Sequence, residues 1–417
     1  MGKKQWKKCM LTAEMILFLF AAILTFREAS VIYRNNSGAK PSAGMTNEDP
    51  APQDSEKSQT GEEKDYIKWV DFHVTCEAMR QACAYDVESY GQEGHVNWVD
   101  LLAYLGAKYG GDFKQYREKD MEEIAGKLQS GETTVEKLSS EITSFDYYRE
   151  AYGAVLDGLV GEYEVSESTG EQESEVMQGQ PGNQGRTGDK QNTVWTKKYG
   201  LKGFSPIAKS FPYNDYDDFG VARSYGYRRE HLGHDMMGQT GTPVVSVESG
   251  YVSAMGWNQY GGWRLGISSF DGKRYYYYAH LRQNFPYCKS LEVGSIVQAG
   301  DVIGYMGRTG YSAKENVNNI DTTHLHFGLQ LIFDESQREG NHEIWVDVYE
   351  LVKFLYKNQS EVVRDDATKE WSRVREIKDP AAEEYKKTES GKAPDKQVSS
   401  RFLHQARNLA RITSAYT

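Results

Sequence analysis

Cysteine is scarce in this chain, with four residues among 417: Cys9, Cys76, Cys83 and Cys288. Their spacing fits no thiolate metal site of the kind that holds structural zinc. Cys76 and Cys83 are seven residues apart, which on one straight helix separates them by about 10 Å. A disulfide cannot span that distance, so we expect both cysteines to be buried, unpaired small residues.

The chain also lacks an excess of positive charge, because its formal net charge is -11 at pH 7. A nucleic-acid-binding protein needs a basic face, so this balance argues against that class. Hydrophobic residues make up 39% of the chain, which permits a packed core. A mean hydropathy of -0.69 indicates that much of the chain lies outside that core. The length allows two or three domains.

Long apolar runs are absent beyond the N-terminal region. Four lysines in the first eight residues precede a mainly apolar run over residues 10–26, interrupted by Thr12 and Glu14. The run is near the minimum length of a spanning helix, and the lysines predict that its start stays cytoplasmic. Arg27 and Glu28 follow where a cleavage site would need small residues, which favours an uncleaved anchor. The alternative is a signal peptide that is removed, and either reading exports the rest of the chain.

Composition changes along the chain divide it into segments. Two stretches rich in Gly, Ser, Glu and other polar residues read as linkers. We expect a basic segment and membrane anchor over 1–35, a disordered linker over 36–64, a helical domain over 65–163, a second linker over 164–194, an enzymatic domain over 195–357 and a charged flexible tail over 358–417.

The segment from 65 to 163 carries helical patterns. Apolar residues recur at steps of three and four from Phe72 to Tyr90, which indicates one helix face. Asn97 is suited to cap a second helix that Gly110 and Gly111 end. Further helices are expected around Met121–Leu128, Val135–Ile142 and Tyr148–Leu159. We expect the aromatic residues here to be core. This segment contains no recognisable group of catalytic residues. Protein partners are one expectation for this domain.

The chain beyond residue 195 changes to short alternating runs broken by glycine, which predict an antiparallel all-β domain. Asp271-Gly272 between two such runs is a strong hairpin signal. Residues 344–357 predict one amphipathic helix. The expected strands are 242–247, 251–255, 263–270, 273–280, 302–305 and 324–333.

Five of the nine histidines fall between residues 231 and 326 of this domain. His231 and Asp235 are four apart, and His324 and His326 are two apart. On an extended strand an even separation places both side chains on one face, so each pair can serve one site. Two histidines and one aspartate, with an open fourth position, suit a catalytic zinc ion. A helical His-Glu-x-x-His motif is absent from the sequence.

Four blocks then occur in a specific order. They are His231-Leu-Gly-His-Asp235, Tyr278-Ala-His-Leu281, a glycine-spaced stretch from 294 to 310, and Thr323-His-Leu-His-Phe327. Together they resemble the lysostaphin-type, LytM-like zinc endopeptidases of peptidoglycan over roughly residues 210–335.

This resemblance implies the roles of the site residues. His231, Asp235 and His326 would hold one Zn²⁺ per chain, and His280 and His324 would form the catalytic pair. It implies an antiparallel β domain of the duplicated-hybrid-motif type, with peptidoglycan as the partner. We expect His234, at odd spacing from His231, to be a supporting or exposed residue. The segment between Gly310 and His324 is longer than the resemblance leads us to expect, and we expect it to enlarge one groove wall.

The resulting hypothesis is a single-pass membrane protein whose extracellular domain hydrolyses peptide bonds in peptidoglycan stems or cross-bridges. The secreted form after signal cleavage is the alternative location. A non-catalytic adaptor in a sporulation, division or conjugation complex is the alternative function, and loss of a ligand would be its mark. No ligand is missing from the motifs.

Overall fold

The computed structural model describes residues 66–167, 193–224 and 228–391. The chain divides into two compact units, 1–44 and 45–417, and all described residues belong to the second. The expected anchor and the first linker therefore lie outside the described residues. Within the described part, no helix combines the length and apolarity that crossing a membrane requires.

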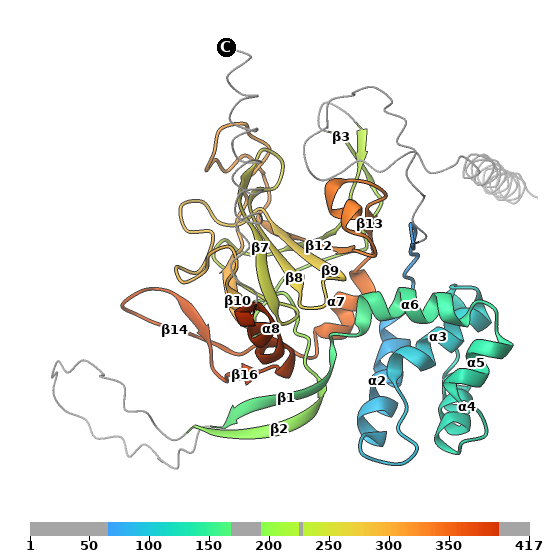
Figure 1. The fold of residues 1–417 in the computed structure, drawn as a ribbon. Coiled ribbons are helices and arrows are strands. Elements are labelled where there is room, and N and C mark those ends of the chain that lie inside the picture. Colours follow the sequence, from blue (N-terminus) through green and yellow to red (C-terminus); the bar gives the residue numbers. More distant parts are fainter. Residues whose placement is uncertain (1–65, 168–192, 225–227, 392–417) are drawn as a thin grey trace, which may run out of the picture. The chain divides into compact units, whose positions relative to one another are not determined.

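Five α-helices and one short 3-10 helix form the N-terminal part of the described chain (Figure 1). The expected capping holds for the second of these helices. The Asn97 side chain accepts a hydrogen bond from the Val99 amide, and Gly110 ends the helix with a φ of 61°. The helices are α2 (Cys76–Ser89), α3 (Trp98–Tyr109), η1 (Phe113–Gln115), α4 (Glu118–Gln129), α5 (Val135–Glu141) and α6 (Phe145–Leu156).

The structure differs from the sequence patterns at the ends of two helices. Phe72 lies before α2, because the Thr75 side chain caps the helix by accepting a hydrogen bond from the Ala78 amide. Val87 and Tyr90, expected on the buried face, are 36% and 41% exposed. The last helix begins at Phe145, three residues earlier than the pattern indicates. Cys76 and Cys83 are free and buried, as expected, and so is Cys288.

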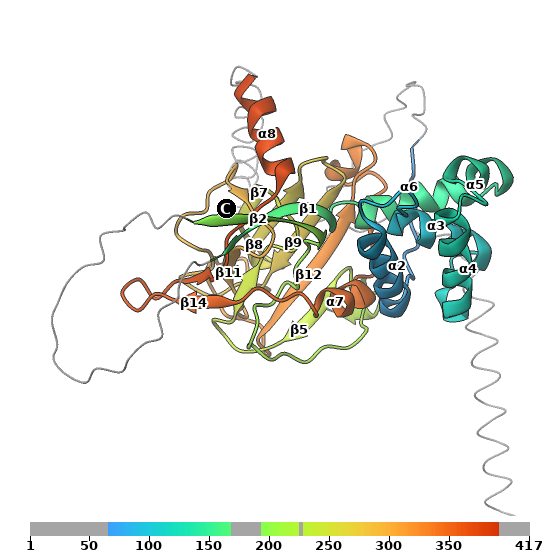
Figure 2. The ribbon, with the colours of Figure 1, turned by 90° about the horizontal axis from the view of Figure 1, so that it is seen from below.

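The C-terminal part centres on an antiparallel sheet in the order β10-β7-β8-β9-β12-β13, with β5 pairing the start of β12 on the same edge as β13 (Figures 1 and 2). The expected Asp271-Gly272 turn joins β8 to β9, with Gly272 at a φ of 74°. A smaller pair joins β6 to β11. The strands are β5 (His234–Met237), β6 (Pro243–Val245), β7 (Gly250–Asn258), β8 (Gly262–Ser269), β9 (Arg274–Ala279), β10 (Ile296–Val297), β11 (Val302–Tyr305), β12 (His324–Leu331) and β13 (Ile344–Trp345).

The structure differs from expectation in three segments: the second linker, the helix expected over 344–357 and the C-terminal tail. Strands flank the second linker, since β1 (Val160–Glu167) pairs with β2 (Val194–Leu201), while residues 168–192 lie outside the described residues. The expected 344–357 helix is confined to α7 (Tyr349–Leu355), because its first residues form β13. The tail holds β14 (Val362–Arg364), β15 (Trp371–Arg373), β16 (Ile377–Lys378) and α8 (Pro380–Gly391).

The tail is ordered through a few buried contacts that leave no periodic pattern in the sequence. Strand β16 adds to β1, which places Ile377 in a small core. Arg373 donates to the Ala299 carbonyl at 2.8 Å and pairs with Asp301 at 3.1 Å. Asp379, also buried, pairs with Lys202 at 2.9 Å. Strands of two or three residues are too short to show alternation, so composition alone suggested a solvated tail.

The helical and sheet parts share one hydrophobic core rather than having separate ones. Trp98 of α3 packs on Phe354 of α7, with ring centroids 5.7 Å apart. The Cys76 amide at the start of α2 donates to the Glu350 carboxylate of α7 at 2.7 Å. The helical part is therefore joined to the sheet part by apolar packing and by hydrogen bonds.

A buried ion pair joins the last helix of the helical part to the main sheet. Arg274 of β9 donates from Nε to Glu248 at 2.7 Å and from Nη1 to the Ala154 carbonyl of α6 at 3.0 Å. The Tyr276 hydroxyl donates to the same carboxylate at 2.7 Å. Gly158 permits this approach, because a Cβ there would lie 1.6 Å from Glu248 Oε1. Every charge in this network is hydrogen-bonded, which is the condition for burying it.

We predict that Arg274→Met destabilises the protein by about 3–5 kcal/mol, because it leaves the Glu248 carboxylate buried without its cation. Urea unfolding followed by circular dichroism measures this. Arg364→Met, at an exposed position of β14, should change the free energy of unfolding by less than about 0.5 kcal/mol. Equal effects of the two substitutions would contradict the prediction.

Candidate metal centre

Strand β12 determines where the site forms, because it is paired on both edges. His326 lies opposite Asp235 of β5 on one side and opposite Ala279 of β9 on the other. His324 and His326 are two residues apart on this strand and share a face, as the spacing predicts. His280 directly follows β9, so it arrives beside the same face.

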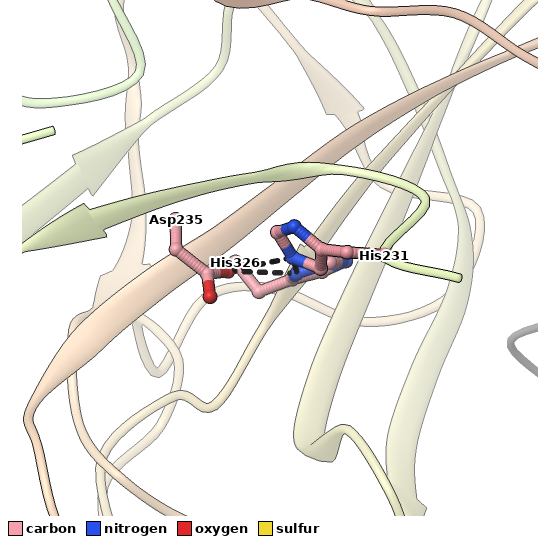
Figure 3. Close-up of side chains that lie close together, drawn as sticks. All are labelled: His231, Asp235 and His326. Atoms are coloured by element: carbon pink, nitrogen blue, oxygen red, sulfur yellow. Dashed lines mark hydrogen bonds and ion pairs between the residues drawn. The ribbon is translucent and has the colours of Figure 1, made fainter. Parts of the chain in front are cut away.

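Three donor atoms converge beside β12, and Figure 3 shows their side chains pointing toward one another. His231 Nε2 lies 2.9 Å from His326 Nδ1 and 3.1 Å from Asp235 Oδ1, and the last two atoms are 2.9 Å apart. In a tetrahedral zinc site with bonds of about 2.0–2.1 Å, neighbouring ligand atoms lie roughly 3.3 Å apart. The observed triangle is close to that size. One cation at the centre of the triangle would interact with a lone pair from each of the three atoms. Hydrogen bonds between the three side chains engage these lone pairs less completely.

His231 reaches the triangle from a loop. The prediction that His231 and Asp235 lie on the same face of one strand is therefore wrong. Strand β4 (Arg228–Glu230) ends before it and β5 begins at His234. The turn passes close to β12 at Gly233, where a Cβ would lie 2.5 Å from His326 Cε1. A side chain at that position would displace the imidazole of His326.

Two residues that sequence reasoning missed orient the triad from outside. His231 Nδ1 donates to the Asp218 carbonyl at 3.0 Å and lies 3.2 Å from its carboxylate, which leaves Nε2 for a metal. The Arg223 guanidinium bridges Asp218 at 2.6 Å and Asp235 Oδ2 at 2.8 Å. Asp218 stands in an acidic stretch that reads as a solvated loop, yet it is 2% exposed. The sequence holds no spacing signal for either residue.

His234 is placed outside the triad. Its Nε2 lies 2.9 Å from Asp215 Oδ2, and its ring packs edge-on against Tyr349. The residue is 1% exposed, so of the two roles expected for it, the structure agrees with the supporting one and not with an exposed one. Of the isolated histidines, His73 and His342 are exposed, His95 pairs with Asp86, and His404 lies outside the described residues.

His280 and His324 lie together beside the triad, with ring centroids 4.8 Å apart. His280 Nδ1 donates to the Thr309 carbonyl at 2.9 Å, and His324 Nδ1 donates to the Thr322 carbonyl at 2.8 Å. A carbonyl only accepts, so in each neutral ring Nε2 carries the lone pair. His280 adopts a φ of 60°, a left-handed conformation that costs a non-glycine residue free energy and recurs at functional sites.

The protonation states of the metal-free triad follow from burial and mutual contacts. Burial lowers the pKa of His231, but hydrogen bonds with Asp218 and Asp235 outweigh it and raise the pKa to about 9. Burial lowers the pKa of His326 to about 4, against the opposing contact with Asp235. Hydrogen bonds from both histidines overcome the burial of Asp235 and hold its pKa far below the usual range. Burial, with His324 and His326 nearby, lowers the pKa of His280 well below its ordinary value.

A cleft opens beside the triad, and aromatic and charged side chains line it. Of the tyrosine run in β9, Tyr276 and Tyr278 are in the core and Tyr277 lines the cleft, because side chains alternate between the two faces of a strand. Tyr311, from the unexpectedly long segment, also lines the cleft, and its ring centre lies 5.8 Å from that of His280. The lining residues are Arg223, Arg229, Glu230, His231, Tyr260, Gly261, Tyr277, Ala279, His280, Tyr311 and His326.

A His-Asp-His triad beside an antiparallel sheet, with two further histidines next to it and a cleft at its side, is the arrangement of a metallopeptidase domain. Residues 229–339 match the family model described as Peptidase family M23. The chain therefore carries a domain of peptidase family M23.

Curated relatives match part of the chain. The chain is 38% identical over 124 residues to the L-Ala--D-Glu endopeptidase of Bacillus subtilis, covering 30% of this chain and 36% of the relative. It is 37% identical over 98 residues to lysostaphin of Staphylococcus simulans, covering 23% and 17%. The chain thus spans about a third or less of the length of these relatives.

Solved structures resemble the chain as well. A candidate glycyl-glycine endopeptidase LytM of Ruminococcus gnavus aligns at 22% identity with a TM-score of 0.44, covering 70% of this chain and 92% of the other. The catalytic domain of lysostaphin from Staphylococcus simulans aligns at 29% identity with a TM-score of 0.27, covering 34% and 92%.

We predict that Zn²⁺ binding near neutral pH releases about one proton, because a metal-free His231 with a pKa of about 9 must deprotonate to become a ligand. His326 is already neutral and Asp235 already ionised at that pH. Apparent zinc affinity should therefore rise roughly tenfold per pH unit between about pH 7 and 9 and level off above. Calorimetric titration in buffers of different ionisation enthalpy measures the proton count.

The control exploits two aspartates that contact different histidines. Asp218→Asn weakens the contact that raises the His231 pKa, so fewer protons should be released at pH 8. Asp215→Asn, which contacts His234 instead, should behave like the wild type. A zinc affinity that does not change between pH 7 and 9 would contradict this account.

Proposed function

We propose that this protein is a zinc-dependent endopeptidase that hydrolyses peptide bonds in peptidoglycan stem peptides or cross-bridges. The observation that carries the proposal is the convergence of His231, Asp235 and His326 on one point, beside His280 and His324, in one cleft of an M23 domain. The names of the relatives support the substrate class. They specify an L-Ala--D-Glu endopeptidase in one case and a glycyl-glycine endopeptidase in another.

The triad suits one zinc ion by number, type and geometry. Two imidazoles and one carboxylate are the ligand types of catalytic zinc, and three protein ligands leave the fourth position open. The remaining polar atoms of the ligands are held from outside, His231 Nδ1 by Asp218 and Asp235 Oδ2 by Arg223. When bound, zinc polarises a carbonyl group and lowers the pKa of a coordinated water molecule to about 7.

His280 is equipped to accept a proton in this reaction. Its Nδ1–H is fixed by the Thr309 carbonyl, so Nε2 is the basic nitrogen and the ring cannot change tautomer without losing that bond. Its low pKa keeps the ring neutral at the start of the reaction, which is the state a general base requires. The Gly261 carbonyl fixes the backbone by accepting from the His280 amide at 2.8 Å.

His324 complements this role from the other side of the pair. Its Nδ1 is likewise fixed by a carbonyl, and its Nε2 lies 3.7 Å from Asp235 Oδ2. Because Nδ1–H is already engaged by the carbonyl, donation from Nε2 requires the doubly protonated ring. We assign His324, in that form, to hydrogen-bonding the negative charge that develops on the peptide oxygen.

We propose the location that the sequence predicts, in the cell membrane. The lysine cluster before the apolar run at 10–26 supports a single-pass anchor with the peptidase domain outside the cell. Protease treatment of intact cells should remove the M23 domain while an N-terminal tag stays protected inside. Recovery of the protein in the medium without its first residues would favour the cleaved, secreted form instead.

We predict that His280→Ala and His324→Ala each lower kcat on peptidoglycan peptides by roughly 10²- to 10⁴-fold while retaining bound zinc. Asp235→Ala should lose both zinc and activity, because one of three ligands is gone. Mass spectrometry of digested muropeptides and metal analysis of the purified proteins measure the two effects separately.

His73→Ala provides the control, because His73 is an exposed histidine paired with Asp71 and does not line the cleft. It should retain full activity. If the wild-type holoenzyme cleaves no peptidoglycan peptide, or if Asp235→Ala remains fully active, the proposed function is wrong. Complementation of a deletion strain by a folded His280→Ala variant would point to the adaptor alternative.

A further inference from the structure

Two arginines stand directly opposite each other at the edge of the cleft. Strand β3 (Ala222–Ser224) pairs with β4 in an antiparallel ladder whose register places Arg223 opposite Arg229. Cross-strand partners share a face, and both of these side chains line the cleft. Like charges opposite each other destabilise a two-stranded ladder. Both guanidinium groups therefore bring positive charge to that face.

The charge of Arg223 is matched within the protein. Its guanidinium contacts Asp218 and Asp235 at 2.6 and 2.8 Å, and both carboxylates are almost completely buried. Arg223 is therefore part of the support of the metal triad. The two carboxylates that balance its charge lie beneath the cleft and belong to the site already described.

Arg229 has a different environment. Its guanidinium carbon lies 5.0 Å from the Tyr311 ring centre and 5.9 Å from that of Tyr260, and its Nη2 donates to the Tyr311 hydroxyl. Stacking on aromatic faces holds a guanidinium in place while its edge can still donate. The acidic residue of the cleft lining, Glu230, is exposed at the rim.

Tyr311 connects this arginine to the reacting groups. Its ring lies nearly parallel to that of His280, at 29° and 5.8 Å, so His280 and the Arg229 guanidinium are both neighbours of the Tyr311 ring. An extended peptide advances about 3.3–3.6 Å per residue. A substrate that reacts at His280 would therefore pass Arg229 within about three residues of the bond that is cut.

We propose that Arg229, held by Tyr260 and Tyr311, forms a subsite for a free carboxylate of the peptide substrate. A guanidinium fork binds a carboxylate with two parallel hydrogen bonds, and the Tyr311 hydroxyl adds a polar contact beside it. The preferred substrate is then an acidic stem peptide rather than an uncharged glycine cross-bridge. This inference rests on the proposed function and specifies its substrate.

The test measures binding to the zinc-loaded His324→Ala protein, which is not expected to turn over substrate. The probes are two synthetic peptides, L-Ala-γ-D-Glu-L-Lys-D-Ala with a free α-carboxylate on its glutamate, and the same peptide with that group as the carboxamide. Calorimetry should show the acid binding at least roughly tenfold more tightly than the amide. Adding Arg229→Gln should reduce this ratio to about one and change the affinity for the amide by less than about threefold.

Further variants separate a direct contact from loss of structure. Arg364→Gln, added to His324→Ala, removes an exposed arginine outside the cleft lining and should keep the wild-type ratio. Arg229→Lys keeps the charge without the planar fork, so its ratio should be intermediate. Zinc content and the melting temperature of each variant report whether the triad and the fold are retained.

Two results would overturn the proposal. One is equal affinity of the His324→Ala holoprotein for the acid and the amide. The other is an equal loss of affinity for both peptides in Arg229→Gln or, should that variant lose zinc, in Arg229→Lys. Because binding is measured without turnover, these results are independent of zinc-dependent cleavage by the wild type, on which the proposed function depends.

Discussion

The site depends on the pairing of β12 with a strand on each edge. Strand β5 pairs with residues 324–327 and β9 with residues 326–331, so His326 lies where both ladders overlap. Leu325 and Phe327, its neighbours in sequence, are fully buried on the opposite face. A slip of one residue would turn those two side chains to the cleft and both histidines into the core. Apolar burial beneath the strand thus fixes the imidazoles above it.

This constraint explains how so many polar groups can be buried together. His231, Asp235, His280, His324 and His326 are each 7% exposed or less. Buried polar groups are tolerated when they have partners, and here strands and loops fix those partners. Carbonyls accept from His280 and His324, His231 contacts Asp218, His326 contacts Asp235, and Asp235 Oδ2 pairs with the Arg223 guanidinium. The remaining lone pairs of the triad converge on one point. Such a set is preorganised for a cation before any substrate arrives.

The residues that line the cleft come from two parts of the chain. One set lies on or directly after β9 and β12 and includes Tyr277, His280 and His326. The other is formed by the β3–β4 hairpin and by Tyr311 of the segment before β12. The first includes histidines of the sequence blocks. The second belongs to parts outside the sequence blocks, and there the cationic Arg229 and its aromatic neighbours give this protein a means to select its substrate.

The sequence alone determined the class of protein and the identity of the central residues. Histidine pairs at even spacing, an Asp-Gly turn and alternating runs are local signals, since two-residue periodicity and turn chemistry act over a few neighbours. They indicated the antiparallel domain and the shared face of His324 and His326. The capped helix at Trp98 was equally local, because Asn97 and Gly110 act on the backbone next to them.

The tertiary structure decided whatever depends on partners distant in sequence. Asp218 supports His231 only because a loop returns to it, and Arg223 bridges two carboxylates from a separate hairpin. The tail reads as solvated, yet β16 joins β1 across more than two hundred residues. The burial of Arg274 likewise requires a carbonyl of α6. Contacts between distant segments depend on how the chain closes its loops, and neither composition nor periodicity records that closure.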